Sequence, residues 1–70
     1  MHNQDVLKFS PSMREALAFV ATEDLADKKK LKRPRSMSFY ALEMRGMIFR
    51  GSTVYDCSLT EKGRRAFEAI

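Results

Sequence analysis

The chain has 70 residues, a single cysteine and a formal net charge of +4. This length provides one domain, close to the lower limit for a core that folds without disulfides or metals. Apolar residues make up 44% of the chain and charged residues 31%, so we expect a globular protein rather than a disordered one. The N-terminal residues lack the pattern of a secretion signal, and no apolar run approaches the ~20 residues that span a bilayer. With Cys57 unable to form an internal disulfide, we expect a cytoplasmic protein.

Positive charge is concentrated in one segment, KKKLKRPR, from Lys28 to Arg35. It holds six of the thirteen basic residues and no acidic residue, whereas the rest of the chain, with all nine acidic residues, has a net charge of −2. A basic patch on a near-neutral body is typical of proteins that bind a polyanion, with nucleic acid first and an anionic surface second. Short basic runs also occur in solvated loops, so charge alone leaves both interpretations open.

Local signals predict a first helix from Ser10-Pro11 to about Thr22, after a lead-in over residues 1–9 that is either flexible or a short strand. The Ser10 hydroxyl can cap free amides, and proline is well tolerated at the first helical position. Ser12 and Glu15 offer an alternative capping box two residues later. The apolar residues at helical spacing are Met13, Ala16, Leu17, Val20 and Ala21.

Two further helices are expected before residue 47. The first, over Glu23–Lys30, begins with acidic residues and ends with lysines, as the helix dipole favours. Its thin apolar face is Leu25, Ala26 and Leu31. Because proline disfavours helical geometry at the preceding residue, residues 32–35 are expected to form a turn around Pro34. The next helix starts at Arg35 or Ser36, buries Phe39 and Leu42, and ends at Gly46.

A hairpin and a last helix complete the predicted order. The strands are Met47–Arg50 and Thr53–Leu59, joined by a tight turn at Gly51-Ser52, so that residues 48–50 pair with residues 53–55. Alternation in the second strand places Tyr55, Cys57 and Leu59 on the core side. Thr60 caps the last helix. Its residues at helical spacing are Gly63, Ala66, Phe67 and Ile70.

The order helix, helix, turn, helix, hairpin, helix resembles that of winged helix-turn-helix DNA-binding domains. In ALEMRGMIF, Leu42, Gly46 and Ile48 match the leucine, glycine and aliphatic residue between the family's third helix and its wing. LTEKGRRAF is similar to the family's leucine-threonine pair followed by glycine, and SPSMREAL to its first helix, so the resemblance spans roughly Ser10 to Phe67. It implies a single α+β domain over residues 1–70, with three helices, a two-stranded wing and a C-terminal helix. The spacing between Leu25 and Phe39 is a few residues longer than in compact members, and the basic segment occupies the excess.

The resemblance also implies which residues face DNA. In a winged helix the third helix enters the major groove and the wing lies along phosphates or the minor groove. The outward positions here are poor in the arginines, asparagines and glutamines that contact base edges. We therefore assign the arginines mainly to phosphates and the lysines to nonspecific attraction. The predicted DNA-binding residues are Lys28, Lys29, Lys30, Lys32, Arg33, Arg35, Ser36, Tyr40, Arg45 and Arg50.

Phe49 is predicted to point away from the core, because its neighbour Ile48 points into it. An exposed phenylalanine beside the wing would suit a contact surface, including one between two copies of the chain. The alternative is that the lead-in around Leu7 and Phe9 covers it.

No catalytic constellation, phosphate-binding glycine loop or metal-ligand spacing is present, and His2 and Cys57 are isolated in the sequence. We therefore expect no enzyme activity, no cofactor and no metal. Two functions remain. The first is a small transcriptional regulator that binds double-stranded DNA, of the kind found in phage or mobile elements. The second is a protein-interaction module, an adaptor or inhibitor that keeps the fold without binding DNA.

Overall fold

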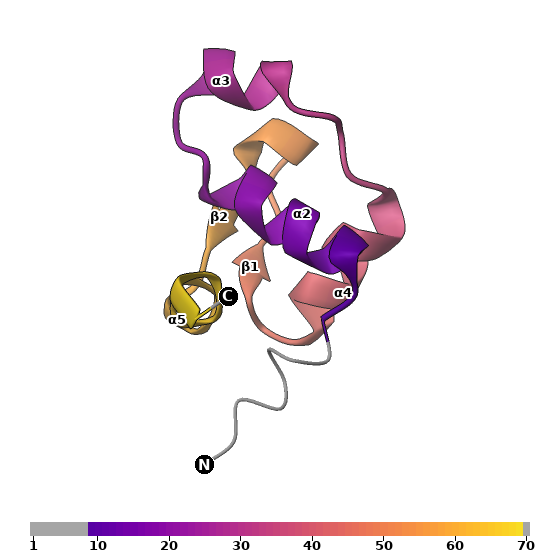
Figure 1. Cartoon of the computed structure of the whole chain (residues 1–70), viewed down its shortest axis with the longest axis vertical. Helices are drawn as coiled ribbons and strands as arrows, with labels where there is room; N and C mark the ends of the chain where they lie inside the picture. Colours follow the sequence, from indigo (N-terminus) through magenta and orange to yellow (C-terminus); the bar gives the residue numbers. More distant parts are fainter. Residues whose placement is uncertain (1–8, 70) are drawn as a thin grey trace.

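The computed structural model describes residues 9–69 and combines helices with one small antiparallel sheet (Figure 1). Within that range the helices are α2 (Pro11–Ala21), α3 (Leu25–Lys30), α4 (Ser36–Met44) and α5 (Glu61–Ala69). Strand β1 (Ile48–Phe49), the 3-10 turn η1 (Val54–Asp56) and strand β2 (Ser58–Leu59) lie between α4 and α5. The predicted α+β class and order of helices are confirmed. The predicted lead-in, apart from Phe9, and the predicted core position Ile70 lie outside the described residues.

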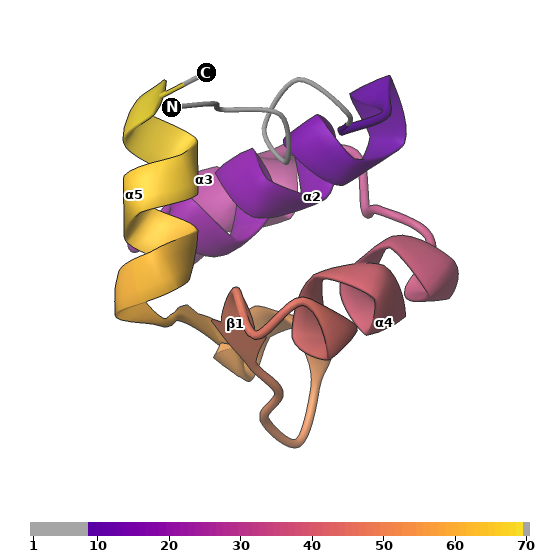
Figure 2. The ribbon, with the colours of Figure 1, turned by 90° about the horizontal axis from the view of Figure 1, so that it is seen from below.

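Helix α2 runs across the molecule and contacts α4, α5 and β2 (Figure 2). Helices α4 and α5 lie on either side of β1 in this view, and α3 lies behind α2. Figure 1 shows α3 at one end of the molecule, joined to the rest by a loop on each side. The core therefore forms between α2, α4, α5 and the sheet, and α3 is peripheral to it.

The helix starts follow the caps that the sequence offers. The Ser10 hydroxyl accepts a hydrogen bond from the Met13 amide at 3.2 Å, and Thr60 Oγ1 accepts one from the Gly63 amide at 3.0 Å, both as predicted. Helix α3 starts later than predicted, because Asp24 caps it by accepting from the Asp27 amide at 3.0 Å. Each cap satisfies an amide that has no partner within the first turn.

Phe19 is the centre of the core, although helical spacing did not select it. Its side chain is only 1% exposed, and its ring meets the Phe39 ring edge-on at 5.9 Å between centroids. The Tyr55 ring lies on it at the same distance in a tilted arrangement. Phe39 and Leu42 are fully buried, as predicted. The buried apolar residues are Phe9, Ala16, Leu17, Phe19, Val20, Phe39, Leu42, Met47, Ile48, Cys57 and Ala66.

The predicted apolar face of the second helix is wrong. Leu25 is 50% exposed, and Ala26 and Leu31 are exposed as well. Instead Lys28 is buried, with its ammonium 5.7 Å from the centroid of the Phe19 ring. A lysine can bury its aliphatic stem while its charge lies over an aromatic face, so α3 meets the core through a cationic residue.

The end of α4 is a glycine cap, as predicted. Gly46 has φ +73°, a conformation that glycine adopts without a Cβ clash. Its amide donates to the Glu43 carbonyl oxygen at 2.9 Å, and the Met47 amide donates to the Leu42 carbonyl oxygen at 2.9 Å. These two bonds form the Schellman arrangement that ends many helices. The chain thereby reverses and directs Met47 and Ile48 into the core.

The predicted tight turn at Gly51-Ser52 is also wrong. β1 and β2 pair through Ile48 with Leu59 and Phe49 with Ser58, rather than through residues 48–50 with 53–55. Thr53 starts the 3-10 turn η1 where a strand was predicted. Its hydroxyl accepts a hydrogen bond from the Tyr55 amide at 3.2 Å, and its carbonyl oxygen accepts one from the Asp56 amide at 3.1 Å. Such local bonds compete with strand pairing. Residues 50–57 therefore form a loop that contains η1 and packs both Val54 and Tyr55 against the core.

Candidate nucleic-acid interface

Four basic side chains between the end of α3 and the start of α4 are exposed: Lys30, Lys32, Arg33 and Arg35. We call these four residues the basic segment. None of them forms an ion pair or side-chain hydrogen bond with another residue of the 9–69 range. Leu31 and Pro34 are the other residues of this stretch, so no acidic residue lies between the four charges. This is the arrangement that attracts and positions phosphates.

The two preceding lysines are held differently. Lys28 is 4% exposed, which removes it from the surface on which its predicted DNA contact depends. Lys29 is exposed, and its ammonium lies 5.8 Å from the centroid of the Tyr55 ring. The lysines to which we assign nonspecific attraction are thus divided by helical geometry, because residues 28 and 29 lie on different sides of α3.

The start of α4 is open to an anion. Arg35 occupies the N-cap position, but its side chain makes no capping hydrogen bond. The first amides of a helix have no partner inside the helix, and they favour negative charge together with the helix dipole. Ser36, which follows, is exposed. Arg35, a predicted phosphate contact, and Ser36, a predicted DNA-binding residue, are thus the N-cap and first residue of a helix start without a side-chain cap.

Arg45 and Arg50, the other predicted arginines, are engaged within the protein. The Arg45 guanidinium lies 5.1 Å from the centroid of the Phe9 ring, and the side chain is half-buried. Arg50 Nη1 forms an ion pair with Glu43 Oε1 at 3.5 Å, and its guanidinium lies 6.0 Å from the centroid of the Phe39 ring. Because Glu43 neutralises Arg50, the β1–β2 loop presents less positive charge than the sequence suggests.

The exposed surface of α4 includes three large apolar or aromatic side chains. Met37 is 79% exposed and Met44 69%, and Tyr40 lies between them at helical spacing. We call Met37, Tyr40 and Met44 the apolar stripe. Phe49, on β1, is 63% exposed, which agrees with the prediction that it points away from the core. Of the two residues expected to cover Phe49, Leu7 lies outside the described residues, and Phe9 is buried in the core while Phe49 stays exposed.

Neither a metal centre nor a membrane segment is found in residues 9–69. No group of three or more His, Cys, Asp and Glu side chains in this range is placed to hold a metal ion. None of the helices in the same range has both the length and the hydropathy of a membrane-spanning segment. Comparison of the chain with protein-family models, curated proteins and solved structures found no match.

Proposed function

We propose that this chain is a winged-helix DNA-binding domain, a small transcriptional regulator that binds mainly to the DNA backbone. The observation that carries the proposal is the basic segment, whose four exposed cations lead directly into the uncapped start of α4. Phosphate oxygens bind both to such cations and to free amides at a helix N-terminus. Outside residues 28–35 the chain has a net charge of −2.

The order of elements supports the winged-helix interpretation. Helices α3 and α4 are consecutive and joined by a short loop, and the β1–β2 loop follows α4 directly. In such domains the helix in the position of α4 lies on the DNA and the loop touches the backbone beside it. The apolar stripe offers few groups that hydrogen-bond to base edges. We therefore propose that backbone contacts dominate and that sequence preference is weak.

The direct test is a titration of fluorescent duplex DNA of random sequence at several salt concentrations, followed by anisotropy. Neutralising phosphates releases condensed counterions, so the logarithm of the affinity should fall linearly with the logarithm of the salt concentration. At about −0.9 per phosphate contact, the slope should be roughly −3 to −5 for the basic segment and its neighbours. An absence of binding to any duplex at low salt would refute the proposal.

A matched pair of variants assigns the contact to the basic segment. Arg33→Ala with Arg35→Ala should weaken binding to all sequences alike and flatten the slope by about 2, because two phosphate contacts are lost. Lys62→Ala with Arg65→Ala removes the same charge from α5, which lies away from the basic segment (Figure 1). If both double variants lose the same affinity, binding reflects net charge and not this surface.

The second candidate is a protein-interaction module, and the exposure of the apolar stripe together with Phe49 favours it. Exposed apolar side chains that gather on one face mark contact surfaces for proteins. Met37→Ser with Met44→Ser separates the two functions, since it changes the stripe but no charge. A DNA-binding protein that uses mainly the backbone should keep its salt slope in this variant. A chain that binds no duplex in any form would leave the protein-interaction module as the better hypothesis.

A further inference from the structure

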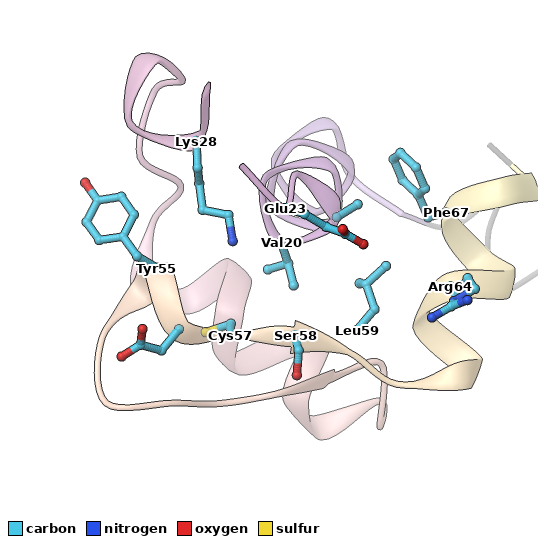
Figure 3. A pocket seen from close by; sticks show the side chains of 11 residues that line it. Val20, Glu23, Lys28, Tyr55, Cys57, Ser58, Leu59, Arg64 and Phe67 are labelled. Atoms are coloured by element: carbon cyan, nitrogen blue, oxygen red, sulfur yellow. The ribbon is translucent and has the colours of Figure 1, made fainter. Parts of the chain in front are cut away.

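A cavity of about 530 Å³ lies between the end of α2, the η1–β2 segment and α5, on the side where α3 approaches the core. Its volume is within the range of 300–1,000 Å³ that is usual for small-molecule sites. Figure 3 shows the side chains that line it, with Lys28 and Tyr55 on one side and Arg64 and Phe67 on the other. Val20, Cys57 and Leu59 lie between them.

The Lys28 ammonium points into this cavity (Figure 3). The residue is 96% buried, in that only 4% of its surface is exposed, yet no described carboxylate lies within ion-pair distance of it. Glu23 and Asp56 also line the cavity, but neither pairs with Lys28. The one interaction observed for the ammonium is with the face of the Phe19 ring at 5.7 Å.

The stem of Lys28 is buried, whereas its ammonium keeps some exposure at the cavity surface, because no fully buried side-chain nitrogen or oxygen of the described residues lacks a hydrogen-bond partner. An ammonium in this position loses part of its hydration, and no described carboxylate pairs with it to offset the loss. The Phe19 ring offsets part of this cost. An anion with an oxygen within hydrogen-bond distance of the ammonium would offset the rest. The cavity provides the space for such an anion, since Lys28 faces its interior.

The other lining residues define what kind of anion fits. Val20, Leu59 and Phe67 give the cavity an apolar wall, which suits a ligand with a hydrocarbon body. Lys28 and Arg64 bring two positive charges to the lining and Glu23 and Asp56 bring two negative ones, so the lining does not favour a ligand with more than one negative charge. No glycine lines the cavity, so there is no glycine-rich backbone loop of the kind that binds phosphate. These features disfavour phosphate and multiply charged anions.

We infer that this cavity binds a small monocarboxylate with an apolar body, whose carboxylate pairs with Lys28 while its hydrocarbon part lies against Val20, Leu59 and Phe67. The site is separate from the basic segment, and the inference stands whether or not the chain binds DNA. Its occupant would join α3 to α2, β2 and α5, because Lys28 is the α3 residue that lines the cavity.

The test uses three probes of one size that differ in charge: sodium hexanoate, hexan-1-ol and hexylamine. Each is titrated into the isotope-labelled protein while amide chemical shifts are recorded. Hexanoate should cause saturable shifts at Tyr55, Cys57 and Ser58, and the alcohol and the amine should bind at least about tenfold more weakly, the equivalent of one hydrogen bond to a charged group. Equal binding of hexanoate and hexanol, or no saturable shift with hexanoate, would overturn the inference.

Two lysine variants test whether Lys28 is the residue that binds the carboxylate. Lys28→Met keeps the unbranched stem against Phe19 and should lose the preference for hexanoate over hexanol. Lys30→Met makes the same change at the exposed end of the same helix and should leave that preference unchanged. A preference for hexanoate over hexanol that survives in the folded Lys28→Met variant would overturn the inference. The comparison of probes on the unaltered protein decides the question even if Lys28→Met fails to fold.

Discussion

The Thr60 hydroxyl donates a hydrogen bond of 2.7 Å to the carbonyl oxygen of Gly46, fourteen residues earlier in the chain. The same hydroxyl oxygen accepts a bond from the Gly63 amide, which caps α5. In addition, the Thr60 amide donates to the Met47 carbonyl oxygen at 3.0 Å. One threonine thus joins the end of α4 to the start of α5 and extends the pairing of β1 with β2.

Replacing Thr60 with valine should destabilise the fold by about 1–2 kcal/mol, because the variant keeps the shape of the side chain but loses both hydroxyl bonds. Thr60→Ser keeps the hydroxyl and should lose much less. Urea unfolding of both variants measures the difference. Equal stability of the two would show that the hydroxyl bonds do not contribute.

Gly63→Ala should destabilise the protein although alanine is the better helix former. A Cβ at this position would lie 1.9 Å from the Met47 carbonyl oxygen and 3.3 Å from Leu59 Cδ2. The required shift should cost roughly 1–3 kcal/mol, which exceeds the usual gain of about 1 kcal/mol from replacing glycine in a helix. Thermal unfolding of the variant and the parent shows whether the substitution raises or lowers stability. An increase in stability would mean that α5 does not approach Met47 this closely.

Leu42→Ala should be among the most destabilising single substitutions. Leu42 is fully buried, and deleting such a leucine costs roughly 2–5 kcal/mol, a large part of a small domain's stability. Met44→Ala, two residues later on the exposed face of α4, is the control and should be close to neutral. Denaturant unfolding measures the free energy of unfolding of both variants. Similar losses in both variants would contradict the orientation of α4.

Glu43→Gln tests the β1–β2 loop under the proposed DNA-binding function. The substitution removes the ion pair with Arg50 and leaves that guanidinium available to a phosphate. Affinity for duplex DNA should rise, and the salt slope should steepen by about 0.9, the value for one added contact. Stability should change by less than ~1 kcal/mol, because the pair is partly exposed.

The control for this variant is Glu68→Gln, which makes the same change of charge at an exposed position on α5. An equal gain of affinity in both variants would attribute the effect to net charge rather than to Arg50. A steeper slope in Glu43→Gln alone would assign a backbone contact to the loop.

The sequence by itself determined the features that depend on neighbouring residues. Ser10 and Thr60 cap their helices through bonds that span three residues, and Gly46 ends α4 because glycine alone adopts its φ without strain. Phe39 and Leu42, one helical turn apart, share the face of α4 that is buried. For the candidate site, the concentration of charge in the basic segment is visible in the sequence, because its four residues lie within one stretch of six residues.

Tertiary structure alone decided the features that depend on what lies opposite a residue. Phe19 is buried because α2 is covered on more than one side, by α4 and by Tyr55, so a single helical stripe could not identify it. Lys28 lies inside because an aromatic face happens to meet the stem of a lysine, which hydrophobic patterning does not register. The strand register followed Thr53, whose local turn, together with the packing of Val54 and Tyr55 on the core, outweighed the tight hairpin that Gly51-Ser52 permits. In each case the free energy of burial depends on contacts between residues that are distant in the chain.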